Sequence, residues 1–234
     1  MIQKNDSWKM FNQISKSYDF LNNFLSLGIH HIWKQKLVNK ISFSTNSGKV
    51  LDAATGTGDI LYSIMDKFHH NIATITGLDL SKNMMEVGKQ KLAKKPYKDK
   101  VTFLHADACK IPFDDQVFDI ITISFGIRNV PDVKQALAEM KRVLNNTGKL
   151  MILEFSIPTT PLFRSVYLFY FRKILPFLGG LFSGKFSAYK YLNESVEDFP
   201  YGEQFKQLML NAGFTKVESQ ELGLGIATIY EGYA

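Results

Sequence analysis

The spacing of apolar residues divides the chain into two parts. From residue 8 to residue 41 apolar side chains recur every three to four positions, which predicts helices. From Lys49 onward short apolar runs alternate with amphipathic stretches, which predicts strands that alternate with helices. The polar stretch "SFSTNSG" between the two parts is expected to be a loop. Such alternation indicates βαβ units and a parallel sheet.

Seven strands are expected in the alternating part. The first five cover residues 49–54, 73–80, 100–107, 118–126 and 149–156, and two closing strands cover 215–222 and 226–234. The fourth run is apolar at nearly every position, which is typical of a central parallel strand covered on both faces. We therefore expect an α/β fold with a mostly parallel seven-stranded sheet and helices on both of its faces.

Helices are expected between these strands, over 59–68, 81–95, 132–144 and 203–213. Ser81 is a candidate cap for the second of them, because a serine side chain can accept from the free amides of a first helical turn. The stretch "NNTG" (145–148) is expected to be the turn that ends the third.

One segment interrupts this alternation. Residues 155–193 are aromatic and apolar, carry five basic residues, and contain no acid from Phe155 to Asn193. We interpret the whole chain, 1–234, as a single domain, with 1–46 as an N-terminal helical lid and 155–193 as an apolar, basic, helical insert after the fifth strand.

Length and composition are those of an ordinary globular protein. The chain has 234 residues, 45% hydrophobic and 21% charged, which suits one domain with a full core. Its one cysteine, Cys109, excludes an intramolecular disulfide and argues against a cysteine metal cluster. The sequence shows no apolar signal-peptide core and no convincing membrane span. We expect a cytoplasmic protein without a metal site.

The net charge of +6 and the pI of about 9.2 favour an anionic partner, either nucleic acid or a membrane surface. The alternative is a solvated, lysine-rich surface. We expect that alternative to hold for most of the chain and the insert to be the exception.

The glycine loop in "LDAATGTGD" follows the first predicted strand, where open α/β sheets bind their ligands. It lacks the lysine of a triphosphate-binding loop. Gly56 and Gly58 match the start of a dinucleotide fingerprint, but its third glycine position is Leu61. Asp52 and Asp59 flank the loop and would repel a pyrophosphate. We therefore expect a ligand that lacks phosphate and carries positive charge.

S-adenosylmethionine has these properties. Asp79 ends the second predicted strand about 20 residues past the glycines, where a ribose-binding acid is expected. Asp107 ends the third strand and could contact the adenine edge, with the Ala108 amide beside it. Each signal alone has a structural alternative, a tight turn for the loop or a helix start for Asp79. Their order along three strand ends favours the cofactor site.

With these residues identified, the sequence resembles the ubiquinone/menaquinone biosynthesis C-methyltransferase family of class I methyltransferases. The stretches that carry the resemblance span nearly the whole chain: "YDFLNNFLSLGIHHIWK", "LDAATGTGD", "ISFGIRNVPD", "LEFSIP" and "YLNESVEDFPYGEQF". The resemblance implies a Rossmann-like class I methyltransferase fold with S-adenosyl-L-methionine as cofactor. It places the cofactor-binding residues, beside the loop glycines, at Thr57, Asp79, Asp107, Ala108 and Ser124.

Two stretches depart from the family's usual pattern. His31 stands where the family often has an arginine, and Ala54 and Thr55 precede the loop where many relatives have another pair. Neither departure touches the core of the cofactor site. The first concerns the substrate role of the N-terminal segment.

The implied reaction transfers a methyl group to a ring carbon of a prenylated quinol. A reduced ring can attack the methyl group, and a fixed cation near a ring oxygen would favour the reactive quinolate. Arg128 is our candidate for that cation and Asn129 for binding the other ring oxygen. The structural alternatives are a salt bridge from Arg128 to an acid such as Asp132 and a turn role for Asn129. Proton removal would need water or a histidine such as His30, because arginine is a poor proton acceptor.

The most specific function that the resemblance implies is methylation of demethylmenaquinol to menaquinol. It leaves open whether the protein also catalyses the benzoquinol step of ubiquinone biosynthesis. The insert could line a channel for the prenyl tail and rest on an anionic membrane surface at its inner face, or could be a plain helical cap. The alternatives are a methyltransferase for another small or lipid acceptor and a non-catalytic quinol-binding scaffold. We expect no nucleic-acid partner, because the insert mixes its basic residues with aliphatic ones. The oligomeric state is left open.

Overall fold

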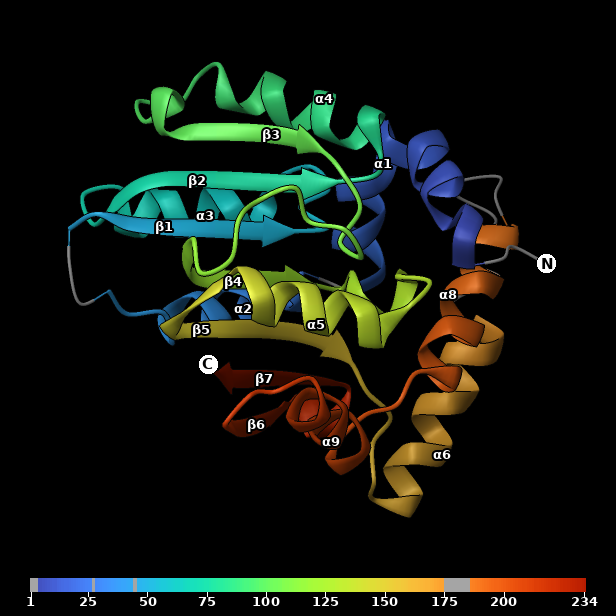
Figure 1. Cartoon of the computed structure of the whole chain (residues 1–234). Helices are drawn as coiled ribbons and strands as arrows, with labels where there is room; N and C mark the ends of the chain where they lie inside the picture. The colour runs from blue at the N-terminus through green and yellow to red at the C-terminus, as the bar shows by residue number, and fades with distance from the viewer. Residues whose placement is uncertain (1–3, 27, 44–45, 175–185) are drawn as a thin grey trace.

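The computed structural model describes residues 4–26, 28–43, 46–174 and 186–234. Its centre is a seven-stranded sheet in the order β3-β2-β1-β4-β5-β7-β6 (Figure 1). All its strands run parallel to one another except β7, which is antiparallel to both neighbours. The strands are β1 (Gly48–Ala53), β2 (Ile72–Asp79), β3 (Val101–His105), β4 (Phe118–Ser124), β5 (Leu144–Phe155), β6 (Lys216–Leu222) and β7 (Ala227–Tyr233). The expected mostly parallel α/β sheet is confirmed.

Helices cover both faces of the sheet. One core contains side chains of α5 and α9, and the core on the opposite face contains side chains of α2 and α3 (Figure 1). The helices are α1 (Ser7–Ser26), α2 (Ile29–Asn39), α3 (Asp59–Phe68), α4 (Lys82–Leu92), α5 (Val133–Val143), α6 (Pro161–Phe169), α8 (Phe186–Asp198) and α9 (Glu203–Asn211). The helical prediction for residues 8–41 is confirmed by α1 and α2.

Side-chain caps fix where two of these helices begin. The Ser81 hydroxyl accepts from the Met84 amide at the start of α4, as predicted. Asp132 does the same for α5, where its carboxylate accepts from the Gln135 amide at 3.0 Å. Both caps lie at the edge of the sheet where the parallel strands end, so they also fix the loops that form the candidate site.

The stretch 145–148 differs from its prediction. It is not a separate turn after α5 but lies within β5, at an irregularity in the register between β4 and β5. The Asn145 side-chain oxygen does accept from the Thr147 amide at 3.2 Å, a bond typical of turns. Asn145 also donates to Asp119 on β4. This second bond holds the stretch against the neighbouring strand, so pairing continues through it.

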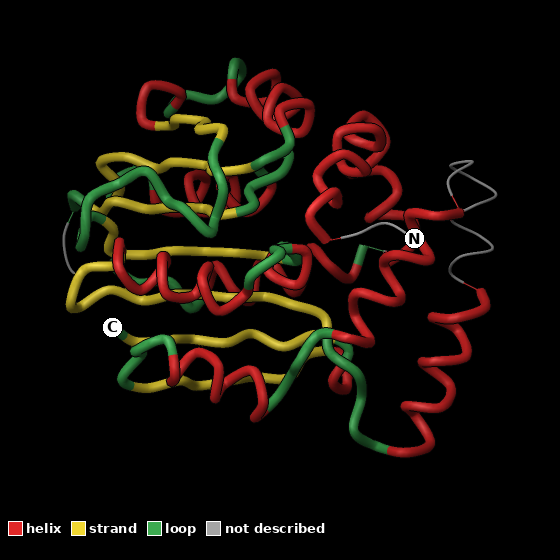
Figure 2. The backbone as a smooth tube through the Cα atoms, turned by 45° about the vertical axis from the view of Figure 1, so that its right-hand side comes forward, coloured by secondary structure: helices red, strands yellow, loops and turns green. Residues whose placement is uncertain are grey.

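The N-terminal helix and the insert lie together beyond the carboxyl ends of the parallel strands (Figures 1 and 2). The insert contains α6, a π-helical stretch (Tyr170–Ile174) and the start of α8. Its residues 175–185 lie outside the described residues. In the part of the chain that the structure describes, no helix combines the length and apolar composition needed to cross a bilayer.

Candidate active site

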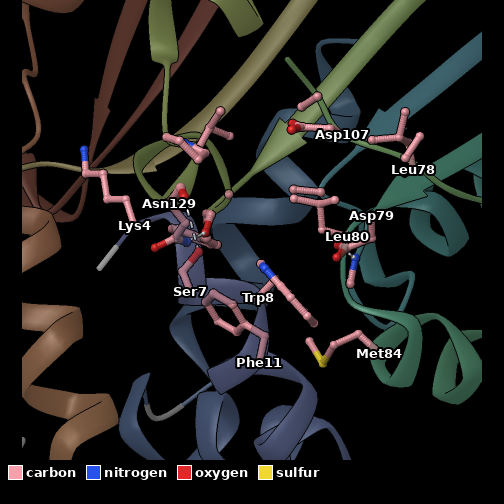
Figure 3. A pocket seen from close by; sticks show the side chains of 18 of the residues that line it. Lys4, Ser7, Trp8, Phe11, Leu78, Asp79, Leu80, Met84, Asp107 and Asn129 are labelled. Atoms are coloured by element: carbon pink, nitrogen blue, oxygen red, sulfur yellow. Dashed lines mark hydrogen bonds between the residues drawn. The ribbon is translucent and has the colours of Figure 1, made fainter. Parts of the chain in front are cut away.

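A cavity opens at the carboxyl ends of β1, β2 and β4 (Figure 3). The space between its walls is about 740 Å³ when the open mouth is included. One wall consists of the loops that follow the strands. The opposite wall consists of N-terminal side chains, from Lys4, Ser7, Trp8, Phe11 and Tyr18.

Asp79 lies at the end of β2 and lines this cavity. One carboxylate oxygen accepts from the Gly56 amide at 2.8 Å and the other from the Ser81 amide at 2.7 Å. Burial raises the pKa of this carboxyl group, against the effect of the two amides. The carboxylate is therefore fixed between the glycine loop and the start of α4, with further lone pairs left for a ligand.

The glycine loop needs its glycines for backbone geometry. Gly56 has φ +57° and Gly58 has φ +84°, a region that favours glycine. A Cβ on Gly58 would also come within 2.6 Å of the Tyr62 ring. Gly56 lines the cavity, whereas Gly58 only shapes the turn that leads into α3.

Thr57 does not line the cavity. Its side chain is buried, and its hydroxyl donates to Asp19 of α1 at 2.7 Å. Asp19 also forms an ion pair with Lys91 of α4 at 2.7 Å. The structure therefore places Thr57 in a contact that holds α1 against the loop.

Three more expected cofactor residues do line the cavity, namely Asp107, Ala108 and Ser124. Asp107 follows β3 and accepts from the Cys109 amide at 2.8 Å, which fixes its carboxylate. Ser124 ends β4, and its hydroxyl is buried without a hydrogen-bond partner among the described residues. A buried polar atom of this kind indicates a group that a ligand satisfies.

Arg128 and Asn129 lie on a 3-10 turn directly after β4. The Arg128 guanidinium donates to the carboxylate of Glu154 on β5 at 2.6 Å and to the Phe125 carbonyl at 2.7 Å. The acid that pairs with Arg128 is thus Glu154 and not Asp132, which caps α5. Asn129 lines the cavity, while Arg128 lies behind it.

The two acids that flank the glycine loop are both satisfied within the protein. Asp52 accepts from the hydroxyls of Thr55 and Thr122, each at 2.6 Å, and burial raises its pKa to about 6 despite these bonds. Burial alone would raise the pKa of Asp59, but Lys34 and Lys91 together lower it well below its usual range. Neither acid lines the cavity. Their effect on a ligand is therefore weaker than the sequence indicated.

His30 does not reach the cavity either. It is buried in α2, and its Nδ1 atom lies 2.6 Å from the Ser26 hydroxyl. Burial lowers its pKa to about 4, with a further contribution from Lys34. His30 is thus a neutral, hydrogen-bonded group in this fold.

Sequence reasoning named no individual residue of the N-terminal wall. The signal was present as the aromatic residues Trp8, Phe11 and Tyr18 of α1, which line the cavity. Figure 3 labels the first two of them. Sequence reasoning also missed Glu154. The sequence feature that could have revealed it is that Glu154 is the one acid in the apolar run "LMILEFS". An acid in a buried strand requires a partner, and in the structure that partner is Arg128, 26 residues away.

The residues present fit S-adenosyl-L-methionine. The cavity offers two fixed carboxylates at adjacent strand ends and an unsatisfied hydroxyl at a third. A phosphate ligand would meet Asp79 and Asp107 on the same wall. Within the described residues, no group of three or more His, Cys, Asp or Glu side chains could hold a metal ion.

Known proteins are similar to this chain over nearly its whole length. The model of the ubiE/COQ5 methyltransferase family matches residues 2–234. The ubiquinone/menaquinone biosynthesis C-methyltransferase UbiE of Geotalea daltonii is 50% identical over 96% of this chain and 94% of its own. The UbiE protein of Francisella philomiragia is 42% identical over 96% of this chain and 89% of its own.

Solved structures show the same fold at low identity. A SAM-dependent methyltransferase of Thermotoga maritima aligns with a TM-score of 0.67 and 18% identity, over 97% of this chain and 98% of that chain. Phosphoethanolamine N-methyltransferase 2 of Haemonchus contortus, solved with S-adenosyl-L-methionine, gives a TM-score of 0.62 and 16% identity, over 86% of this chain and 52% of that chain. The family match and the curated relatives lead to one conclusion: the chain belongs to the ubiE/COQ5 methyltransferase family.

Proposed function

We propose that this protein methylates a ring carbon of demethylmenaquinol to give menaquinol. The proposal makes the family's function more specific. At the level of the family, the protein is a UbiE-family C-methyltransferase of quinone biosynthesis with S-adenosyl-L-methionine as methyl donor. The observation that carries the proposal is the arrangement of the polar groups that line the cavity. Asp79 and Asp107 lie on one side of it, and Asn129, on the turn that holds Arg128, lies on the other (Figure 3).

The cofactor end of this cavity has one group for each part of the donor. Asp79 would hold the ribose hydroxyls, because its carboxylate is fixed by two backbone amides. Asp107 and Ala108 would contact the adenine, and Gly56 and Ser124 the methionine part. When bound, S-adenosyl-L-methionine supplies an electrophilic methyl group attached to a sulfonium. Thr57 contributes indirectly by holding α1, and with it the aromatic wall, against the loop.

Arg128 acts on the acceptor as a fixed hydrogen-bond donor more than as a free charge. Its ion pair with Glu154 offsets much of the long-range field of the guanidinium. A directed N–H bond to a ring oxygen still stabilises charge that develops on that oxygen. Asn129 offers a second polar group on the cavity side of the same turn. The structure gives no role in proton removal to His30, so we assign that step to water.

The insert is proposed to contact a membrane surface. Leu162, Val166 and Phe169 recur at the spacing of one helical face on α6 and are 79%, 60% and 63% exposed. Large exposed apolar side chains next to basic residues such as Lys173 are typical of a helix that lies in a lipid interface. A prenylated substrate would reach the protein from that surface.

The experiment that tests this function uses purified protein and methyl-labelled S-adenosyl-L-methionine. Demethylmenaquinone and its benzoquinone counterpart are each offered oxidised and chemically reduced. We expect label only in reduced rings, and more in the naphthoquinol than in the benzoquinol. Label in neither ring, with the cofactor still bound, would favour another small or lipid acceptor or a non-catalytic quinol-binding role.

A further inference from the structure

Six buried side-chain polar atoms have no hydrogen-bond partner in the described part of the chain. They belong to Ser124, Arg128, Asn129, Tyr167, Tyr191 and Asn193. Native proteins leave few such atoms, because an unsatisfied buried donor or acceptor costs free energy. Ser124 and Asn129 line the cavity already described, but the other four do not.

These four residues come together from three elements. Tyr167 lies on α6, Tyr191 and Asn193 lie on α8, and α8 packs against the turn that carries Arg128. All four are nine-tenths or more buried. Burial raises the pKa of both tyrosine hydroxyls, and the charge of Arg128 is near enough to oppose that rise in each. The geometry links the group: Phe155 lies 5.2 Å from the Arg128 guanidinium and packs against the cluster that contains Tyr167 and Phe171, and Asn193 donates to the Phe171 carbonyl.

Ser7 connects this group of four side chains to the cavity. The Tyr191 hydroxyl lies beside the Ser7 hydroxyl, without a hydrogen bond of good geometry. Ser7 in turn donates to the Asn129 carbonyl at 3.3 Å, and both Ser7 and Asn129 line the cavity (Figure 3). Ser7, in the first turn of α1, therefore contacts both the cavity and Tyr191.

We propose that Tyr167, Tyr191 and the Nε atom of Arg128 bind the oxygens of the acceptor ring. This inference rests on the proposed function and adds to it a binding site built by the insert. The surroundings suit a flat, oxygenated ring. Phe155 lies under the Arg128 guanidinium at 5.2 Å, and Phe171 stacks on Tyr167 at 5.2 Å between ring centroids.

The donors match a hydroquinone in charge as well as in shape. Both tyrosines are neutral at physiological pH, so their hydroxyls can donate to a ring oxygen that becomes negative without repelling it. Arg128 Nε can only donate, and Asn193 Oδ1 can only accept, which suits a ring that carries hydroxyl groups. The site thus favours the reduced ring, whose hydroxyls can donate, over the oxidised ring, which can only accept.

The test uses the full chain with Tyr167→Phe and Tyr191→Phe, and Tyr230→Phe as the control. Tyr230 is equally buried, but its hydroxyl accepts from the Gly202 amide at 2.8 Å. The measured quantities are the KM for the reduced quinol, the Kd for anaerobic 1,4-naphthalenediol as a tail-free probe, the Kd for S-adenosyl-L-methionine, and Tm. We expect each of the two variants to raise the quinol KM and the probe Kd about five- to tenfold and to leave cofactor affinity unchanged.

The change in Tm distinguishes a ligand-binding role of a tyrosine hydroxyl from a structural role. Removing an unsatisfied hydroxyl should leave Tm unchanged or raise it in Tyr167→Phe, whereas Tyr230→Phe should lower Tm and leave the quinol KM unchanged. A quinol KM and a probe Kd within twofold of wild type in both variants would overturn the site. A loss of probe binding in both variants of a protein that methylates no quinol would support the site and reject the proposed reaction.

Discussion

The guanidinium of Arg128 and the carboxylate of Glu154 form a hydrogen-bonded ion pair at 2.6 Å inside the protein, at the ends of neighbouring strands. The Arg128 amide also donates to Glu154, at 3.3 Å. One carboxylate thus fixes both the backbone and the side chain of the turn that meets the cavity. The position of Arg128 is set by β5, an element that the sequence places 26 residues away.

Replacing Arg128 by alanine should lower both stability and turnover, for two separable reasons. The Glu154 carboxylate would be left buried and unpaired, which costs about 3–5 kcal/mol of unfolding free energy. Loss of the donor to the ring oxygen should lower turnover by about a hundredfold or more. Denaturant unfolding and a methyl-transfer assay measure the two effects.

The double variant Arg128→Ala/Glu154→Gln separates these effects. It removes the unpaired charge, so we expect most of the lost stability to return while turnover stays low. Cofactor affinity, measured by calorimetry, should match wild type. If turnover recovers together with stability, Arg128 has only a structural role.

Replacing Asp79 by alanine should abolish cofactor binding. The carboxylate holds the glycine loop through the Gly56 amide and remains available to a ligand. Loss of these charge-assisted bonds should weaken S-adenosyl-L-methionine binding by at least about a hundredfold. Asp66→Asn is the control, because that carboxylate is exposed and pairs with Lys95. Unchanged calorimetric affinity in Asp79→Ala would move the ribose site elsewhere.

Thr57 should affect cofactor affinity indirectly, because its hydroxyl holds α1 against the glycine loop. Thr57→Val and Asp19→Ala each break the bond between the loop and the aromatic wall of the cavity. We expect each to weaken cofactor affinity about three- to tenfold, and the double variant to be no weaker than Asp19→Ala alone. Effects that multiply in the double variant would instead indicate a separate contact from Thr57 to the ligand.

The exposed face of α6 should determine membrane binding. Changing Leu162, Val166 and Phe169 together to glutamine should lower binding to phosphatidylglycerol vesicles about a hundredfold, at about 1 kcal/mol for each side chain. Methylation of a short-tailed quinol in solution should persist. Leu224→Asn is the matched control, because Leu224 is 75% exposed on the β6–β7 connection. Equal vesicle binding by the triple variant and wild type would reject the surface.

Stability should depend on pH through His30. The folded imidazole binds a proton only near pH 4, because burial lowers its pKa, whereas the unfolded one binds a proton near pH 6.5. Between these values the unfolded state binds more protons, so the contribution of His30 to stability is lost as the pH falls from 6.5 to 4. Asp52, whose pKa is raised to about 6, acts in the opposite direction over pH 4–6.

The two contributions can be separated by unfolding at a series of pH values. His30→Gln should remove the part of the slope by which stability rises with pH between 4 and 6.5. Asp52→Asn should remove the opposing part. A wild-type slope in His30→Gln would show that the folded histidine titrates normally.

The sequence by itself determined the mostly parallel sheet and the nature of the ligand. Apolar runs and amphipathic runs of period 3.6 are local properties, so the strands and the helices between them could be placed to within a few residues. Asp79 and Asp107 could be found because strand ends in a parallel sheet meet at one edge, whatever the packing of the rest, while Ser124 was implied by the family resemblance. Asn145 shows where prediction from local sequence fails. It forms the hydrogen bond typical of a turn, but its bond to Asp119 keeps it in the sheet.

Only the tertiary structure decided which polar groups meet. Thr57 and Asp19 are 38 positions apart, Arg128 and Glu154 are 26 apart, and no periodicity connects either pair. Tyr191 lies near Arg128 because α8 packs against the turn that carries Arg128, and Tyr167 joins them through its stacking on Phe171, whose carbonyl accepts from Asn193 of α8. The free energy of burying a polar group depends on the partners it finds, and those partners are set by how distant elements pack.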